Sequence, residues 1–258
     1  MHLAALSTIL QRFGKSINQV CFLISDNSAV NKRLARIMGV PLVGCASHRL
    51  NLAVRLYTAP LENALAGIQK LMVKLRTLNH AAKLRFKTTL RPVLRNDTRW
   101  SSTFAMLDHY VRLLEFIDRE DDAVAELLPS PSVHKKLKGL LEDLKQFESV
   151  SNRLKSESVS LWEVRVMFDA LIAEKPALKQ YLGPRADIVA SPDFESACLI
   201  NVIPPTSNLT ERLFSMARST FGLERHSLSA QSIEMILFLK VNRSYWDAPL
   251  VHESIKVF

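Results

Sequence analysis

The sequence predicts a mixed α/β protein in which helices predominate. Apolar residues that favour β-structure run from Val20 to Ile24 and again from Val40 to Val43. Between these runs, Ala29 to Met38 has the residue spacing of a helix, and Gly39 ends it. The connection is long enough for a parallel strand–helix–strand unit, so we expect a mixed core to begin here.

The middle of the chain is predicted to be all-helical. From Cys45 the apolar pattern is helical through Tyr57, and Pro60 limits its extension. Four further segments place apolar residues three and four positions apart, which indicates helix faces that pack against one another. These segments are Leu61–Leu84, Phe104–Phe116, His134–Leu154 and Leu161–Ala173. Leu182 to Pro205 is interrupted by glycine and proline, and it predicts an irregular connection.

Two helices are expected to close the chain. Pro204 and Pro205 end the preceding structure, Thr206 or Ser207 can cap the first helix, and Ser229 can cap the second. The buried stripes are predicted to contain Leu209, Leu213, Met216 and Ala217 in the first helix and Ile233, Ile236, Leu237 and Val241 in the second.

The charge balance makes nucleic acid the first partner to consider. The chain has 34 Lys plus Arg against 25 Asp plus Glu, a net charge of +9 that attracts polyanions. Its three cysteines are widely spaced, which fits reduced thiols in an intracellular compartment. The apolar runs fall far short of the roughly 20 residues that cross a bilayer, and the first residues lack the features of a secretory signal. We therefore expect no membrane association.

Two acidic residues occupy positions suited to catalysis, although each also has a structural explanation. Asp26 follows the first strand, where ligands bind in α/β folds, but the spacing alone favours a role in capping the next helix. Glu211 falls in the first turn of a predicted helix, where the helix dipole favours any acid. Two such carboxylates could hold divalent metals for phosphodiester cleavage. Spacing does not distinguish them from Asp97, Asp108, Glu115, Asp169 or Asp187.

The remaining candidates also have two interpretations. Cys45 and His48 stand as Cys-x-x-His, but a closed zinc site needs four ligands, so packing is favoured. Trp100 could be a core aromatic beside a surface Arg99, or it could stack on an exposed base while Arg99 neutralises phosphate. Arg212 could contact phosphate or be an ordinary exposed helical arginine.

Four strings of residues, in this order, resemble the hAT superfamily of DNA transposases. They are Ser25-Asp26-Asn27-Ser-Ala-Val-Asn31, Cys45-Ala-Ser-His48-Arg-Leu-Asn-Leu52, Asp97-Thr-Arg99-Trp100-Ser-Ser-Thr-Phe-Ala-Met-Leu107 and Ser207-Asn-Leu-Thr-Glu211-Arg212-Leu-Phe214-Ser215. Two shorter strings, Arg225-His-Ser-Leu228 and Phe238-Leu-Lys-Val-Asn242, follow them.

The resemblance implies a ribonuclease H-like core, split by a large all-α insertion domain, that cuts DNA with an acidic triad and Mg²⁺ or Mn²⁺. Asp26 corresponds to the second acid and Glu211 to the third, and both would be metal ligands. The resemblance also implies DNA contacts for His48, Arg99, Trp100 and Arg212, with Cys45 as a structural companion of His48.

The same resemblance divides the chain into three parts. Residues 1–58 form a partial ribonuclease H-like core, 59–193 the helical insertion, and 194–258 the rest of the core with the family's dimerisation region. The family's first acid lies on an earlier strand, and the nineteen residues before Val20 contain neither Asp nor Glu. A triad with two acids should hold its metal ions weakly.

We therefore expect a transposase-derived nuclear protein that binds DNA, self-associates as a homodimer or higher homo-oligomer, and has an incomplete active site. The alternative is an active transposase whose first acid comes from an upstream segment. A helical interaction protein without DNA contact is a third possibility, which the basic charge and the Arg99-Trp100 pair disfavour. Whether the chain is an enzyme stays open.

Overall fold

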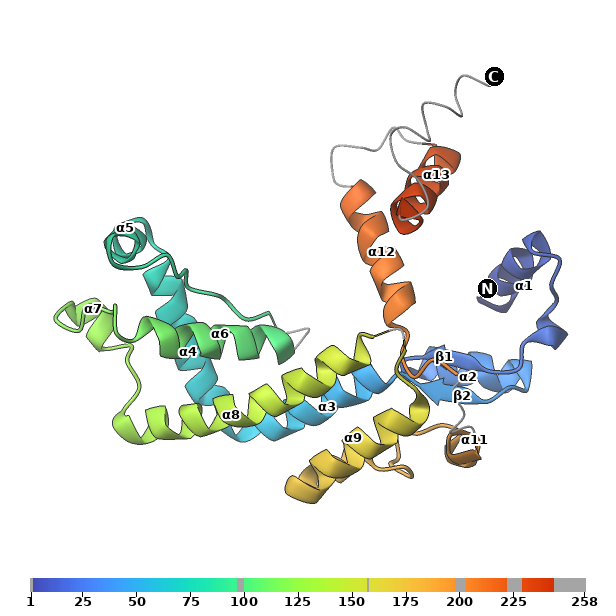
Figure 1. Cartoon of the computed structure of the whole chain (residues 1–258), viewed down its shortest axis with the longest axis horizontal. Coiled ribbons are helices and arrows are strands. Elements are labelled where there is room, and N and C mark those ends of the chain that lie inside the picture. Colours follow the sequence, from blue (N-terminus) through green and yellow to red (C-terminus); the bar gives the residue numbers. More distant parts are fainter. Residues whose placement is uncertain (1, 97–99, 157, 198–202, 222–228, 244–258) are drawn as a thin grey trace. The chain divides into compact units, whose positions relative to one another are not determined.

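A computed structural model describes residues 2–96, 100–156, 158–197, 203–221 and 229–243, and it divides into two compact units (Figure 1). Unit 1 is Met1–Thr206 and unit 2 is Ser207–Phe258, and each is described by itself. The described residues are mostly helical and include a two-stranded parallel sheet. The prediction of a mostly helical protein with one parallel strand–helix–strand unit is confirmed.

The described elements follow one another in this order. Unit 1 contains α1 (His2–Arg12), η1 (Ile17–Gln19), β1 (Leu23–Ser25), α2 (Ala29–Met38), β2 (Leu42–Gly44), α3 (Ala46–Thr58), η2 (Ala59–Leu61), α4 (Glu62–Leu75), α5 (Leu78–Lys87), α6 (Trp100–Leu113), α7 (Asp122–Ala125), α8 (Pro131–Leu154), α9 (Leu161–Glu174), η3 (Pro176–Leu178), α10 (Lys179–Leu182) and α11 (Pro192–Ala197). Unit 2 contains α12 (Asn208–Phe221) and α13 (Ala230–Val241).

The sheet forms where the sequence predicts it, with shorter strands. β1 and β2 run parallel, in a register that pairs Leu23 with Leu42. The connecting helix α2 starts at Ser28, whose hydroxyl accepts the backbone N–H of Asn31. It ends at Gly39, whose φ of 66° lies in the left-handed region that favours glycine. This C-cap turns the chain back so that β2 can lie beside β1.

The outer edge of β2 is covered by side chains. The N–H of Leu42 donates to the Ser191 hydroxyl at 3.1 Å, and the N–H of Gly44 donates to Glu195 Oε1 at 2.9 Å. These bonds satisfy two donors that an edge strand otherwise leaves to solvent. Among the residues that the structure describes, β2 is therefore bordered by the segment around α11 and not by a further strand.

The larger of two apolar clusters joins the helices of unit 1 from α3 to α10, and the smaller one lies at the sheet around Val43. Leu50, Ala53 and Val54 of α3 are almost fully buried, together with residues of α4, α6, α8 and α9. Helix α3 lies along α8, and α6 packs on both α4 and α8 (Figure 1). Because α3 leaves the end of β2 and enters this core, it connects the small sheet to the helical part.

The helix boundaries differ from prediction most clearly after α4. The pattern from Leu61 to Leu84 predicts one helix, whereas the structure has α4 and α5 separated at Arg76 and Thr77. Thr77 has the extended backbone of an N-cap, with φ −63° and ψ 152°. Threonine competes with the helix for backbone hydrogen bonds and favours such positions. None of the described helices has both the length and the apolar character needed to span a membrane.

The described part of unit 2 consists of two helices packed on each other. Ser229 caps α13 by accepting the N–H of Ser232 at 3.1 Å, as the sequence predicts. In α12, the backbone N–H of Glu211 donates to the Ser207 carbonyl at 3.0 Å. The predicted pair of C-terminal helices is confirmed.

Candidate functional site

Asp26 lies directly beyond the carboxyl end of β1 and is exposed to solvent. Its Oδ1 atom accepts the backbone N–H of Ser28 at 3.1 Å and the Asn31 side-chain amide at 2.7 Å. Ser28, and not Asp26, is the N-cap of α2. The interpretation of Asp26 as the cap of α2 is therefore wrong in detail, because Asp26 stabilises the turn before the helix instead.

The surroundings of Asp26 favour its ionised form. Partial burial raises the pKa of the carboxyl group, but hydrogen bonds from Ser28 and Asn31 and the charge of His48 outweigh it, so the pKa lies below the usual value. A carboxylate that is ionised, exposed and fixed in position can accept a cation or a hydrogen-bond donor from a ligand. Geometry and charge are compatible with a site here.

Cys45 and His48 lie next to Asp26 because the start of α3 is joined to the end of β1. The N–H of Cys45 donates to the Ser25 carbonyl at 2.8 Å. Cys45 is fully buried and is the N-cap residue of α3. His48, in the first turn of α3, is half-buried, and its charge acts on Asp26. The structure thus brings three of the sequence candidates together at one edge of the sheet.

Asn27 is a site residue that the sequence analysis assigned no role. Its side-chain oxygen and nitrogen are both buried, without a hydrogen-bond partner among the described residues. The amide lies against Gly44, where an added Cβ would be 2.7 Å from Nδ2 and 2.9 Å from Oδ1. A glycine directly after an apolar run was the available signal, since such a glycine often permits a close approach.

Arg49 is the second residue that sequence reasoning missed. It follows His48 and is 5% exposed. Its guanidinium donates to the carbonyls of Tyr181 and Gly183 and to Glu195 Oε2, at 3.0, 2.8 and 3.2 Å. Glu195 in turn accepts the N–H of Gly44. Arg49 therefore fixes the start of α3, the helix that carries His48, against the segments that border β2.

Trp100 begins α6 and is 7% exposed. Its indole packs against Phe147 in a T-shaped arrangement with ring centroids 6.4 Å apart. Its backbone N–H donates to Asn51 Oδ1 at 3.2 Å. These are the contacts of a core aromatic residue, and the indole would have to leave this packing to stack on a base.

The other candidates are placed as follows. Arg99 lies outside the described residues. Glu211 and Arg212 are exposed residues of α12 in unit 2, and the Ser207 hydroxyl lies 3.4 Å from Glu211 Oε1. Asp26 belongs to unit 1, so the structure supplies no geometry that relates the two acids.

The donor set around Asp26 does not by itself suit a divalent metal. Nowhere in the described part of the chain do three His, Cys, Asp or Glu side chains gather as metal ligands. Asp26 offers one carboxylate, and its Oδ1 is already occupied by two donors. Mg²⁺ needs several hard oxygen ligands, so Asp26 alone would hold it weakly.

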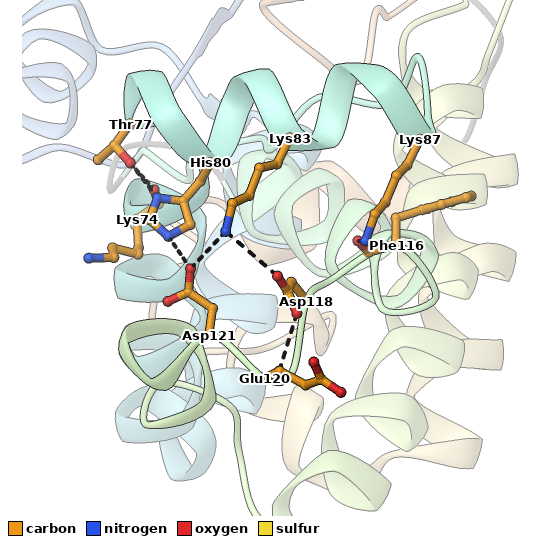
Figure 2. A network of polar contacts seen from close by, with 9 residues as sticks. All are labelled: Lys74, Thr77, His80, Lys83, Lys87, Phe116, Asp118, Glu120 and Asp121. Carbon is orange, nitrogen blue, oxygen red and sulfur yellow. Dashed lines mark hydrogen bonds and ion pairs between the residues drawn. The ribbon is translucent and has the colours of Figure 1, made fainter.

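A second polar cluster links α5 to the loop after α6 (Figure 2). Thr77 Oγ1 lies 2.8 Å from His80 Nδ1, and His80 Nε2 lies 3.2 Å from Asp121 Oδ2. Lys83 Nζ lies 3.4 Å from the same Asp121 oxygen. The order threonine, histidine, aspartate resembles a nucleophile with its base and acid.

The direction of the hydrogen bonds in this cluster is inconsistent with such catalysis. Thr77 Oγ1 also donates to the Lys74 carbonyl at 2.8 Å, which uses its single hydroxyl hydrogen. Nδ1 of His80 must then supply the proton that joins it to Thr77. His80 is consequently not placed to accept a proton from Thr77. The cluster fastens α5, whose only almost fully buried residue is Leu84, to the rest of unit 1.

Comparison of the chain with models of known protein families finds no match, and comparison with curated proteins finds no similar sequence. The resemblance of the four strings to hAT transposases therefore stays a prediction. The structural evidence on function is the placement of the residues that these strings contain.

Proposed function

We propose that this chain is a hAT-type transposase-derived protein that binds DNA and self-associates. The observation that carries the proposal is that three strings chosen from the sequence alone contact one another in unit 1. The Cys45 N–H bond to Ser25 joins the first string to the second, and the Trp100 N–H bond to Asn51 joins the second to the third. Residues that share a functional site are expected to meet in this way.

The residues just before the fourth string are joined to the start of α3 within unit 1. The N–H of Ala46, at the start of α3, donates to the Pro205 carbonyl at 2.9 Å. Glu211 follows Pro205 by only six residues in the sequence. Glu211 itself belongs to unit 2, so its joint action with Asp26 is proposed from the resemblance alone.

The finer fold that we propose is a partial ribonuclease H-like core with a helical insertion. It is supported by the parallel β1–β2 pair and by Asp26 at its carboxyl edge, the edge where ligands bind in α/β sheets. It is also supported by α3, which leads from this edge into a helical core.

Self-association is supported by apolar surface on unit 2. Phe214 is 70% exposed, Met235 59% and Phe238 64%. Large exposed apolar side chains on a short two-helix unit favour coverage by another surface. We propose that a second copy of the chain covers them, so that the protein is a homodimer or higher oligomer.

DNA binding is tested by titrating the purified chain into labelled duplex and single-stranded DNA. We expect binding that weakens steeply with salt, because a basic protein releases counterions from the phosphates. His48→Ala should weaken it, whereas His109→Ala removes a histidine far along the sequence and should not. An absence of binding at low salt would refute the proposal. DNA as partner also implies a nuclear location, which a fluorescent fusion tests.

The second candidate function is metal-dependent DNA cleavage, which the exposed and ionised Asp26 carboxylate favours. Asp26 and Glu211 would then share Mg²⁺ or Mn²⁺ with an acid supplied by another segment. The deciding assay offers a DNA flank prone to hairpin formation and either ion to the chain and to Asp26→Ala. Cleavage by the unchanged chain but not by Asp26→Ala would establish that the protein is a metal-dependent nuclease. DNA binding by both proteins without cleavage would support a non-catalytic DNA-binding protein.

A further inference from the structure

A surface pocket with a cavity of about 400 Å³ lies where α3, η2 and α4 meet the start of α6. Volumes of this size are typical of small-ligand sites. Its wall combines apolar and polar groups from segments far apart in the sequence. The lining residues include Arg55, Ala59, Glu62, Leu65, Arg95 and Trp100.

The charges in this pocket are unequal. Arg95 forms a two-pronged ion pair with Glu62. The hydrogen bond from Arg95 lowers the pKa of Glu62 below its usual value, with a smaller contribution from the charge of Arg55. Glu62 is therefore ionised at neutral pH. Among the described lining residues, two arginines against one carboxylate give a net charge of +1.

Arg55 supplies the charge that is available to a ligand. It is exposed on α3, and among the described residues no hydrogen bond or ion pair holds its guanidinium. Glu62 engages Arg95 instead. The guanidinium N–H groups of Arg55 are thus not used by an acceptor in the described part of the chain. They are therefore suited to bind a phosphate.

The remaining wall suits the non-charged part of a nucleotide. Ala59, Leu65 and Trp100 form an apolar side. A sugar can lie against such a surface while its phosphate reaches Arg55. Carboxylate ligands would also pair with arginine, but the net charge of +9 on the chain favours a polyanion as the source of the anion.

We propose that this pocket binds a phosphodiester group of DNA, with Arg55 as its main contact and Arg95, held by Glu62, as a fixed second cation. The inference rests on the proposed DNA binding and adds two arginines to the residues implicated in it. It needs no movement of Trp100, which acts as a wall. A free nucleotide offers the same phosphate chemistry, and the test separates these two sources.

The test compares Arg55→Ala with Arg76→Ala in the full chain. Arg76 is an exposed arginine directly after α4, at the end of that helix opposite Glu62. Both side chains are exposed, so both variants should fold. Affinity for a single-stranded oligonucleotide is measured over a range of salt concentrations. We expect Arg55→Ala to reduce the slope of log K against log salt by about 1, the effect of losing one phosphate contact, and Arg76→Ala to leave it unchanged.

A second measurement uses thymidine monophosphate and the fluorescence of Trp100. The nucleotide should alter the emission of the unchanged chain and of Arg76→Ala, but not that of Arg55→Ala or Trp100→Phe. If the chain binds neither DNA nor the nucleotide, or if the two arginine variants behave alike, the pocket proposal is refuted. If DNA binds with the same salt slope in both variants, the pocket proposal falls while the proposed DNA binding stands. If the nucleotide binds through Arg55 while DNA does not bind, the pocket is a nucleotide site, and both its proposed DNA contact and the proposed function fall.

Discussion

Arg49 Nη1 lies 3.2 Å from Glu195 Oε2, and the two side chains are only 6% and 13% exposed. Burial lowers the pKa of Arg49 and raises that of Glu195, and each partner opposes the shift of the other. The pair joins α3 to α11 over 146 residues of sequence. Because Glu195 also accepts the Gly44 N–H, one ion pair couples the sheet edge to the helix that carries His48.

Replacing Arg49 with alanine should destabilise unit 1 by about 3–5 kcal/mol, since it leaves the Glu195 carboxylate buried and without its cation. Urea denaturation measures the loss. Arg55→Ala, six residues further along the same helix but exposed, should cost less than about 0.5 kcal/mol. Equal losses of stability in the two variants would mean that the buried ion pair stabilises the fold no more than an exposed arginine does.

The titration of Asp26 should depend on Asn31, which provides its shortest hydrogen bond. In Asn31→Ala the pKa of Asp26 should rise towards 3.8, its value in model peptides. NMR titration of the Asp26 carboxyl carbon measures this. Asn79→Ala serves as the control, because Asn79 is an exposed residue of α5 outside the Asp26 network.

The sign of the accompanying stability change follows from the lowered pKa. The folded state holds the Asp26 proton less tightly than the unfolded chain, so ionised Asp26 stabilises the fold above about pH 3.8. This contribution is lost as the pH falls through the folded-state pKa. Asn31→Ala should reduce it, and a larger effect of the variant at pH 2 than at pH 6 would contradict this account.

Local patterns predicted the secondary structure near the site but not its long-range contacts. The two apolar runs and Gly39 were enough to predict β1, α2 and β2, because strand and helix periodicity and a glycine C-cap are local signals. The break at Thr77 was missed because the apolar spacing continues through it. The preference of a single threonine for an N-cap is a weaker signal than the continuing apolar pattern.

The candidate site was predictable only in part. The positions of Asp26 and His48 were expected from a resemblance, and the Cys45 N–H bond accounts for their proximity. Arg49 could not be found in the same way, since its partners lie 132 to 146 residues away and no periodicity encodes them. Trp100 illustrates the reverse case, in which an aromatic chosen for a functional role packs in the core.

Gly44 and Asn27 should be energetically coupled. A methyl group at residue 44 would meet the buried Asn27 amide at 2.7 to 2.9 Å, closer than van der Waals contact allows. Gly44→Ala should therefore cost about 1–3 kcal/mol, the usual range for overpacking. Asn27→Ala removes the obstacle, so Gly44→Ala should cost much less in that background. Thermal unfolding of the four chains gives the coupling energy, and strictly additive effects would show that the two groups do not touch.

Trp100→Ala separates the two interpretations of this residue. If the indole is a wall of the helical core, its removal should destabilise unit 1 by about 3–5 kcal/mol, as is typical when a buried aromatic is truncated. Trp162→Ala, at a position 54% exposed on α9, should cost far less and controls for the general effect of losing a tryptophan. Denaturant unfolding and DNA titration are measured on the same samples, at temperatures where both variants remain folded. A stable Trp100→Ala protein with weakened DNA binding would mean that the indole stacks on a base. A destabilised protein whose folded fraction binds DNA normally would assign Trp100 to the core and leave Arg55 and Arg95 as the pocket's contacts to nucleic acid.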